Sequence, residues 1–393
     1  MKKIAFVTDV PFWRKSAGNE QRVSQVLDML CDNAEVSLFY IGNTSSKDYE
    51  FLQAQHFSEI YKISYWKQNL KNSIKNIVTQ YFPFLRKYLK RIRKPGSLKT
   101  RRSQAVTELI KKKFAERCYD VLWVEYVWLT YLFDYVPSNV LKFVDTHDVQ
   151  YDRCTSFAKL GLNYDFQITR DEEVNSLKKA DFVVAINSRD NEILSKDLKN
   201  VIEYPYVPFL KKESLEIATL NERKKRVAFI GSAIDFNIKS VEWFIANVWP
   251  LVLKKNSNAE FHVYGKVSNY VRKEKNVYAH GFVEDNSHIY RDNLIFVNPI
   301  LMGGGLKIKC IEALLYGKPL ITTSVGAQGI EKGSGSAFFV ADKAETFAEY
   351  VQNLLNSEDL IVHYSAKAQK FMSDMRWSTR QAEEKIKNII GMV

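Results

Sequence analysis

Two charged residues follow a run of glycines in the C-terminal half of the sequence, and their spacing suggests anion and sugar chemistry. The segment NPILMGGGLKIKCIEALLYGKP passes from an apolar run through three glycines into a helical pattern. On a helix that begins at the glycines, Lys309 and Glu312 lie on one narrow polar stripe of an otherwise apolar surface. Free N–H groups at such a helix start favour an anion such as phosphate. Glu312, further along, suits the paired hydroxyls of a ribose.

The stripe therefore predicts a site for a nucleotide diphosphate that extends from the helix start along the helix body. The alternative is a solvated lysine and glutamate beside a glycine-rich loop, and a glycine-rich loop taken alone favours it. His147, in the motif VDTHDV, poses a similar choice. After a buried strand it is either a structural histidine or a group that contacts a substrate.

Short apolar runs separated by helical patterns must position these residues. In the N-terminal half the runs span residues 3–9, 35–41, 121–127, 141–145 and 181–186. In the C-terminal half they span residues 226–231, 260–265, 294–298, 319–323 and 337–340. This alternation predicts an α/β fold with two doubly wound domains, each a parallel sheet covered by helices on both faces. Prolines and a polar run near 205–225 indicate the linker.

Composition limits the class of protein. The chain of 393 residues is 46% apolar, which is typical of globular domains. The four cysteines are scattered, without C-x-x-C spacing, and no apolar run reaches about 18 residues. We therefore expect a cytoplasmic protein without a signal peptide, a disulfide framework or a membrane span.

Positive charge is concentrated in one segment. The chain carries a net charge of +12, and residues 62–117 hold 17 Lys and Arg against two acidic residues. The segment also shows apolar residues at helical spacing. It predicts either helices with solvated basic faces or a surface for anionic lipid and a lipid-linked acceptor, which would place the protein peripherally at the inner face of the membrane.

Seven motifs are spread over nearly the whole chain, namely GGGLKIKCIEALLYGKPLITTSVGAQGI, HGFVED, FIGSAIDFNIKSVEWF, AGNEQRV, VDTHDV, ADFVVAINSRDNEIL and the helical tail MRWSTRQAEEKIKNII. As a set they resemble the retaining GT-B glycosyltransferases of family 4, in its glycine-rich branch. The resemblance implies two Rossmann-like domains that face a central cleft, with a C-terminal helix that crosses back to the first domain. It places an acceptor-side domain at residues 1–207 with the helix at about 375–393, and a nucleotide-sugar domain at 208–374.

The resemblance also implies an activity. A hexosyl-type group would pass from a nucleotide diphosphate sugar to a glycan or lipid-linked saccharide, with retention of configuration, in the synthesis of cell-surface polysaccharide or glycoconjugate. No cofactor is expected. No metal is expected either, because the sequence lacks the D-x-D spacing with which metal-dependent transferases bind diphosphate.

Site residues follow from matching the motifs position by position. The resemblance implies catalytic roles for His147 and Lys307. It assigns the donor sugar nucleotide to Gly18, Gly231, Ser232, Asn237, Lys239, Val283, Met302, Gly303, Gly304, Gly305, Leu306, Lys309 and Glu312. Gly304 occupies a position where the wider family has a glutamate, so backbone groups would recognise the donor sugar.

Three other functions stay open at this point. A nucleotide-sugar 2-epimerase would use two such domains without an acceptor. A non-catalytic GT-B subunit would support a partner transferase. Nucleic-acid binding through the basic segment ranks third, and we expect none.

Overall fold

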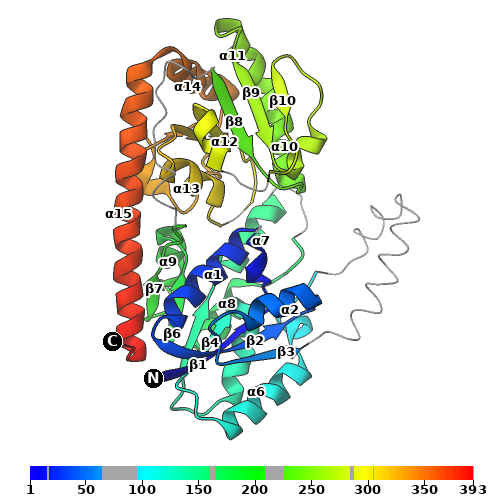
Figure 1. Ribbon diagram of the computed structural model, residues 1–393, viewed down its shortest axis with the longest axis vertical. Helices are drawn as coiled ribbons and strands as arrows, with labels where there is room; N and C mark the ends of the chain where they lie inside the picture. Colours follow the sequence, from blue (N-terminus) through cyan, green and yellow to red (C-terminus); the bar gives the residue numbers. More distant parts are fainter. Residues whose placement is uncertain are drawn as a thin grey trace, which may run out of the picture. The chain divides into compact units, whose positions relative to one another are not determined.

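The computed structural model describes residues 1–15, 17–63, 95–159, 164–208, 225–283, 287–303 and 305–392 (Figure 1). Most of the predicted basic segment, residues 64–94, lies outside this description, and so does Gly304. The chain forms two compact units. Unit 1 comprises Met1–Ile186, Asp190–Tyr204 and Gln381–Val393, and unit 2 comprises Asn187–Arg189 and Pro205–Arg380.

Unit 1 contains a seven-stranded parallel sheet in the order β3-β2-β1-β4-β5-β6-β7. Its strands are β1 (Lys2–Thr8), β2 (Ala34–Ile41), β3 (Glu59–Ile63), β4 (Val121–Glu125), β5 (Leu141–Asp145), β6 (Phe182–Ala185) and β7 (Val201–Glu203). Its helices are η1 (Phe12–Arg14), α1 (Gly18–Cys31), α2 (Ser46–Gln53), α5 (Leu98–Arg101), α6 (Gln104–Glu116), η2 (Val127–Tyr135), α7 (Gln150–Lys159), α8 (Arg170–Leu177) and α9 (Ser188–Leu194). The strand order reverses between β1 and β4, and ligands of such sheets bind beyond the strand ends at that reversal.

Unit 2 contains a six-stranded parallel sheet in the order β10-β9-β8-β11-β12-β13. Its strands are β8 (Arg226–Ile230), β9 (Glu260–Tyr264), β10 (Val277–Ala279), β11 (Ile295–Asn298), β12 (Leu320–Thr322) and β13 (Phe339–Val340). Its helices are α10 (Asp235–Trp243), η5 (Phe244–Val248), α11 (Trp249–Lys255), η6 (Lys266–Tyr270), α12 (Ser287–Asp292), α13 (Ile308–Leu315), η7 (Glu331–Gly333) and α14 (Ala344–Asn356). The long α15 (Glu358–Ile390) supplies residues to both units.

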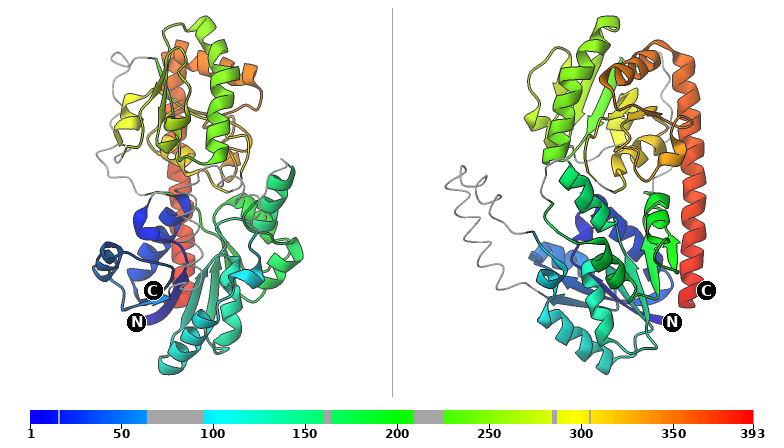
Figure 2. Two further views of the ribbon diagram at one scale, coloured as in Figure 1. Left: turned by 90° about the vertical axis from the view of Figure 1, so that its right-hand side faces the viewer. Right: turned by 180° about the vertical axis from the view of Figure 1, so that it is seen from behind.

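Both faces of the unit 2 sheet are covered, as the strand pattern predicts (Figure 2). Val227 and Phe229 of β8 pack into one hydrophobic cluster with helices α10, α11 and α14. Ala228 and Ile230, which point to the opposite face, pack into a second cluster with α12 and α13. The prediction of an α/β fold with two doubly wound parallel sheets is therefore confirmed.

Three strands lie outside the predicted runs, namely β3, β7 and β10. Two of them, β3 and β7, are edge strands of unit 1, and β10 is an edge strand of unit 2. Their residues are mostly half-buried or exposed, so they lack the continuous apolar run of a central parallel strand. All four cysteine thiols are free. Among the described helices, none combines the length and the apolar content that a bilayer crossing needs.

Candidate functional site

The glycine-rich loop of unit 2 ends before its helix begins. Gly303 has a φ of 118° and Gly305 has a φ of 73°. At such positive φ angles the backbone of a residue with a side chain is strained. The helix α13 therefore starts at Ile308, with Lys307 as its N-cap, and the prediction of a helix that begins at the glycines was wrong. Apart from the neighbours of Gly303 in the chain, no atom of the described residues lies within 4 Å of the place that its Cβ would occupy. The loop backbone thus lies beside open space, where a ligand can approach it.

The two lysines of the motif lie at the start of α13. Lys307 Nζ donates a hydrogen bond of 2.6 Å to the carbonyl oxygen of Gly305. Lys309 Nζ donates one of 2.9 Å to Asn237 Oδ1 and lies 4.4 Å from the centre of the Phe229 ring. The Asn237 amide in turn donates to the carbonyl oxygen of Ser232, at 2.9 Å. The structure therefore brings Lys309 together with two other predicted donor residues, Ser232 and Asn237.

Burial of the Lys309 ammonium changes its acidity. Desolvation, assisted by the nearby charge of Lys307, lowers the pKa of Lys309 to about 7, against smaller opposing effects of Cys310 and Glu312. Among the described residues, no carboxylate pairs with this ammonium to compensate for its lost hydration. An anionic ligand would supply that compensation.

Glu312 lies one turn further along α13 and is held by a tyrosine. The Tyr290 hydroxyl donates a hydrogen bond of 2.7 Å to Glu312 Oε2. The Tyr290 ring stacks on Tyr316, with ring centres 4.4 Å apart. Burial raises the pKa of Glu312, and the Tyr290 bond and Lys309 oppose this rise. Tyr290 is a site residue that sequence reasoning missed, because the motif SHIYRDN carries no recognisable signal.

The remaining predicted donor residues lie in several places. Gly231 follows β8, and its Cβ position would be 3.1 Å from Asn237 Nδ2, so a side chain there would crowd the amide that holds Lys309. Met302 and Leu306 are half-buried in the loop before α13, while Lys239 is exposed on α10. Val283 is half-buried and directly precedes residues outside the description. Gly18 belongs to unit 1, where it is the first residue of α1.

His147 lies in unit 1, just beyond the end of β5. Its φ is 58°, a left-handed conformation that costs a residue with a side chain roughly 1–3 kcal/mol. Nε2 of the ring forms a short hydrogen bond with Glu125 Oε2, at the end of β4. One face of the ring stacks on Tyr126, with centres 4.1 Å apart. Packing and hydrogen bonding therefore fix the imidazole in one orientation.

A buried charge network surrounds His147. Arg22 of α1 donates a hydrogen bond of 2.8 Å to Asp145 Oδ2, and both side chains are completely buried. Asp145 Oδ1 accepts the backbone N–H of His147 at 3.3 Å. Trp123 Nε1 donates to Glu125 Oε1 at 3.0 Å. Sequence reasoning missed Arg22, Glu125 and Asp145, although a carboxylate at the end of an apolar strand run is a usable signal.

The network sets the protonation of the pair at its centre. Burial raises the pKa of Glu125, and His147 opposes this rise. Burial alone would lower the pKa of His147, but the charge and hydrogen bond of Glu125 raise it above its ordinary value. The two groups therefore hold a proton between them more firmly than either would alone.

The same residues raise the question of a metal. One ligand atom each from Glu125, Asp145 and His147 lies within 4.8 Å of the others. Two carboxylates and an imidazole suit a divalent cation in principle. The Arg22 guanidinium, however, already pairs with Asp145, and a cation would face its charge at close range. These residues therefore fit a metal poorly.

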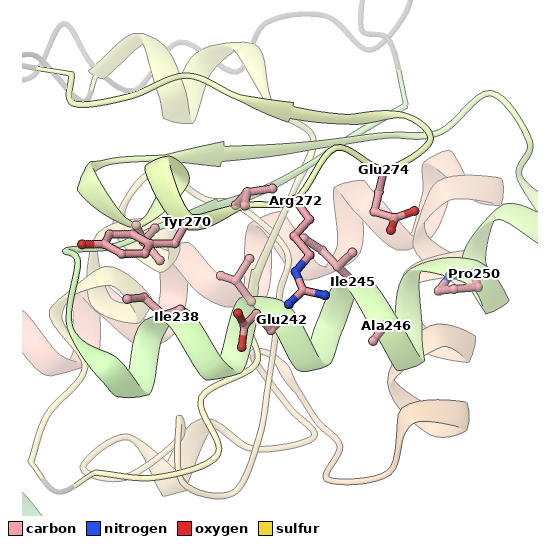
Figure 3. A pocket seen from close by; sticks show the side chains of 11 residues that line it. Ile238, Glu242, Ile245, Ala246, Pro250, Tyr270, Arg272 and Glu274 are labelled. Carbon is pink, nitrogen blue, oxygen red and sulfur yellow. The ribbon is translucent and has the colours of Figure 1, made fainter. Parts of the chain in front are cut away.

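One cavity of 360 Å³ lies elsewhere in unit 2 (Figure 3). Its floor is α10 and the following π-helical turn, and its other side is the segment from Val267 to Glu274. Glu242 and Arg272 point toward each other across it, while Tyr270 lies over Ile238. None of the predicted site residues lines this cavity.

Comparison with known proteins supports one class of enzyme. Residues 224–357 match the family described as Glycosyl transferases group 1. A protein described as an uncharacterized 44.6 kDa protein in the cps region of Klebsiella pneumoniae is 26% identical over 140 residues. This match spans 32% of the chain and 36% of that relative, about a third of its length.

Solved structures resemble the whole chain at low identity. A TarM variant from S. aureus, in complex with fondaparinux, alpha-GlcNAc-glycerol and UDP, has a TM-score of 0.65 at 13% identity, with 99% of this chain and 100% of that chain covered. HepE of Anabaena, in complex with UDP and glucose, has a TM-score of 0.61 at 13% identity and coverage of 98% and 100%. Sucrose-phosphate synthase from Thermosynechococcus elongatus has a TM-score of 0.64 at 12% identity, with both chains covered completely, at 100%. The fold is thus GT-B, and together with the match of unit 2 it supports a glycosyltransferase.

Proposed function

We propose that the chain transfers a sugar from a nucleotide diphosphate sugar to a glycan or lipid-linked saccharide. The observation that carries the proposal is the arrangement at the start of α13. Lys309 is desolvated, and within the described ranges its Nζ pairs with no carboxylate. It lies one turn before Glu312, and both follow a glycine loop with an open backbone. The same segment falls within the match to Glycosyl transferases group 1.

The donor would lie along this helix. Its diphosphate would meet Lys307, Lys309 and the N-terminus of α13, where positive charge and N–H groups favour an anion. Its ribose hydroxyls would donate to Glu312 Oε1, because Oε2 already accepts the Tyr290 hydroxyl. UDP is the carrier to test first, since TarM and HepE were both solved with it.

Retention of configuration and independence from metal belong to the same proposal. The family resemblance of the motifs implies retention. Positive charge from Lys307 and Lys309 would stabilise the departing diphosphate in the role that a metal ion fills in other transferases. Arg22 would disfavour a cation at the carboxylates of unit 1.

The acceptor side of the proposal rests on context. The relative from a cps region supports a role in the synthesis of cell-surface polysaccharide. The proposed attachment to anionic lipid at the inner face of the membrane rests on the basic segment at 62–117, of which residues 64–94 lie outside the described part of the chain. Vesicles with and without anionic lipid test that part separately, since salt screening should abolish any difference between them.

A screen of nucleotide diphosphate sugars by thermal unfolding tests the donor, because a ligand that binds only the folded state raises its stability. The donor that gives the largest shift is then incubated with and without saccharide acceptors, and release of nucleoside diphosphate and sugar products is followed. Acceptor-dependent release is expected. A new sugar nucleotide formed from donor alone would identify an epimerase instead, and donor binding that is weak or missing, without any release, would indicate a non-catalytic subunit.

A further inference from the structure

The hydrogen bond between His147 and Glu125 determines what the other ring nitrogen can do. Nε2 is engaged by Glu125 Oε2, and the ring cannot turn away because Tyr126 stacks on its face. Within the described part of the chain, Nδ1 has no hydrogen-bond partner and is not fully enclosed. Nδ1 is therefore the atom through which His147 can contact a ligand.

Whether Nδ1 donates or accepts depends on how many protons the pair holds. If His147 and Glu125 together are neutral, Nδ1 carries a hydrogen in either arrangement of the shared proton. An imidazolium has both nitrogens protonated, and a neutral ring that accepts from a protonated Glu125 must carry its hydrogen on Nδ1. If the pair carries one negative charge, Nε2 keeps the hydrogen and Nδ1 becomes an acceptor.

The charges around the pair favour the neutral form. Arg22 and Asp145 cancel each other, so a negative His147–Glu125 pair would leave one uncompensated charge among fully buried groups. Asp9, directly after β1, also interacts with the ring, but Arg101 pairs with Asp9 at 3.4 Å and offsets its charge. The raised pKa values of His147 and Glu125 point the same way.

We propose that Glu125 is a positioning residue that holds His147 through Nε2 and makes Nδ1–H a hydrogen-bond donor toward an oxygen of the sugar substrate. The substrate in this statement rests on the proposed function. The protonation state of the ring does not, because it follows from groups within unit 1 alone.

The test is nuclear magnetic resonance of the six histidines, with the ring nitrogens labelled with nitrogen-15. His147→Gln identifies the His147 signals by their disappearance. In the unmodified protein at pH 7, Nδ1 of His147 should carry a hydrogen, and the titration midpoint of the ring should lie above the ordinary value of about 6.5. A ring that lacks the Nδ1 hydrogen at pH 7 would overturn the proposal without any variant of Glu125.

Glu125→Gln supplies the second arm, because the amide keeps the shape of the side chain and removes its charge. It should lower the midpoint of His147 by about one pH unit or more, as expected when a close buried carboxylate is lost. Glu260→Gln is the matched control, since Glu260 Oε2 lies 3.1 Å from His262 Nε2 in unit 2. It should move the His262 titration and leave that of His147 unchanged. If the titration midpoint of His147 were the same in Glu125→Gln as in the unmodified protein, Glu125 would not be its positioning residue.

A kinetic arm separates this inference from the proposed function. In the transfer assay above, Glu125→Gln should reduce kcat and leave the donor KM within about threefold, because unit 2 holds the nucleotide. A donor KM that rises while kcat stays constant would contradict the role. A protein that transfers no sugar at all would defeat the proposed function, while the resonance measurements would still decide whether Nδ1 is a donor.

Discussion

The charged side chains around His147 in unit 1 have charged partners, whereas Lys309 and Glu312 in unit 2 have neutral partners. In unit 1, Arg22 is paired with Asp145 and His147 with Glu125, and all four side chains are buried. In unit 2, Lys309 is bonded to the neutral amide of Asn237 and Glu312 to the neutral hydroxyl of Tyr290.

The difference indicates which region compensates its charges internally and which would gain from a charged ligand. A buried charge that meets an opposite charge is compensated before any substrate arrives. A hydrogen bond to a neutral amide offsets little of the free energy that a lysine ammonium loses on desolvation. An anion that reaches the ammonium would therefore bind favourably. We infer that unit 1 presents a preformed geometry and that unit 2 supplies the affinity for the nucleotide.

The largest expected effect is on the stability of unit 1. Asp145→Asn leaves the buried Arg22 guanidinium without its counter-charge, and the free energy of unfolding should fall by about 3–5 kcal/mol. Urea unfolding followed by circular dichroism measures the change. Lys112→Gln removes one partner of an exposed pair with Glu116 and should cause no measurable change. Equal stability of Asp145→Asn and the unmodified protein would show that the network is not charge-compensated.

Removal of the Glu312 charge should mainly affect ligand affinity. Glu312→Gln replaces charge-assisted hydrogen bonds to the ribose by neutral ones, which costs about 1.5–3 kcal/mol. The dissociation constant for UDP should therefore rise by about 10-fold to 100-fold. Tyr290→Phe is a milder comparison, because it frees Oε2 without removing the carboxylate. An unchanged affinity in Glu312→Gln would place the nucleotide elsewhere.

Affinity for UDP should also depend on pH through Lys309. Its pKa of about 7 means that the ammonium is charged below pH 7 and increasingly neutral above it. An anion binds the charged form, so the dissociation constant should rise with pH above 7, by up to about tenfold per unit. Titrations between pH 6 and 9 measure this slope, and Lys309→Met should flatten it. A slope of equal size in Lys309→Met would assign the effect to another group.

The same shift has a consequence for stability with the opposite sign. The pKa of Lys309 is about 7 in the folded protein and about 10.4 in an unfolded chain. Between these values the unfolded chain binds more protons, so the contribution of this lysine to stability rises with pH in that window. Comparison of Lys309→Met with the unmodified protein at pH 6 and pH 9 isolates it.

The smallest expected effect concerns Lys239, which the motif resemblance assigns to the donor. The structure places it exposed on α10, where solvent and salt screen its charge. Lys239→Gln should therefore change the dissociation constant for UDP by less than about threefold. A loss as large as that of Glu312→Gln would mean that Lys239 reaches the diphosphate directly.

The central strands and the site of unit 2 follow from local patterns in the sequence. Central parallel strands are buried on both faces, so β1, β5 and β8 appear as apolar runs. Edge strands such as β3 lack that signal because one side faces solvent. The start of α13 was predicted three to five residues early, because a pattern of apolar spacing does not reveal the positive φ angles of Gly303 and Gly305.

The network of unit 1 could not be predicted in the same way. Arg22, Glu125 and Asp145 come from three separate elements, and only the strand order of the sheet brings them together. In the sequence, Glu125 and Asp145 each follow an apolar run, whereas Arg22 stands among polar residues. Pairing of such residues is a property of tertiary packing, and no spacing along the chain encodes it.

The most direct test of whether unit 2 supplies the affinity for the nucleotide is calorimetric titration with UDP-glucose. The titration compares the unmodified protein with Glu312→Gln and Glu125→Gln. We predict that Glu312→Gln weakens binding by about tenfold or more and that Glu125→Gln changes it by less than about threefold. Weakened binding in Glu125→Gln together with unchanged binding in Glu312→Gln would contradict the assignment of the nucleotide to unit 2.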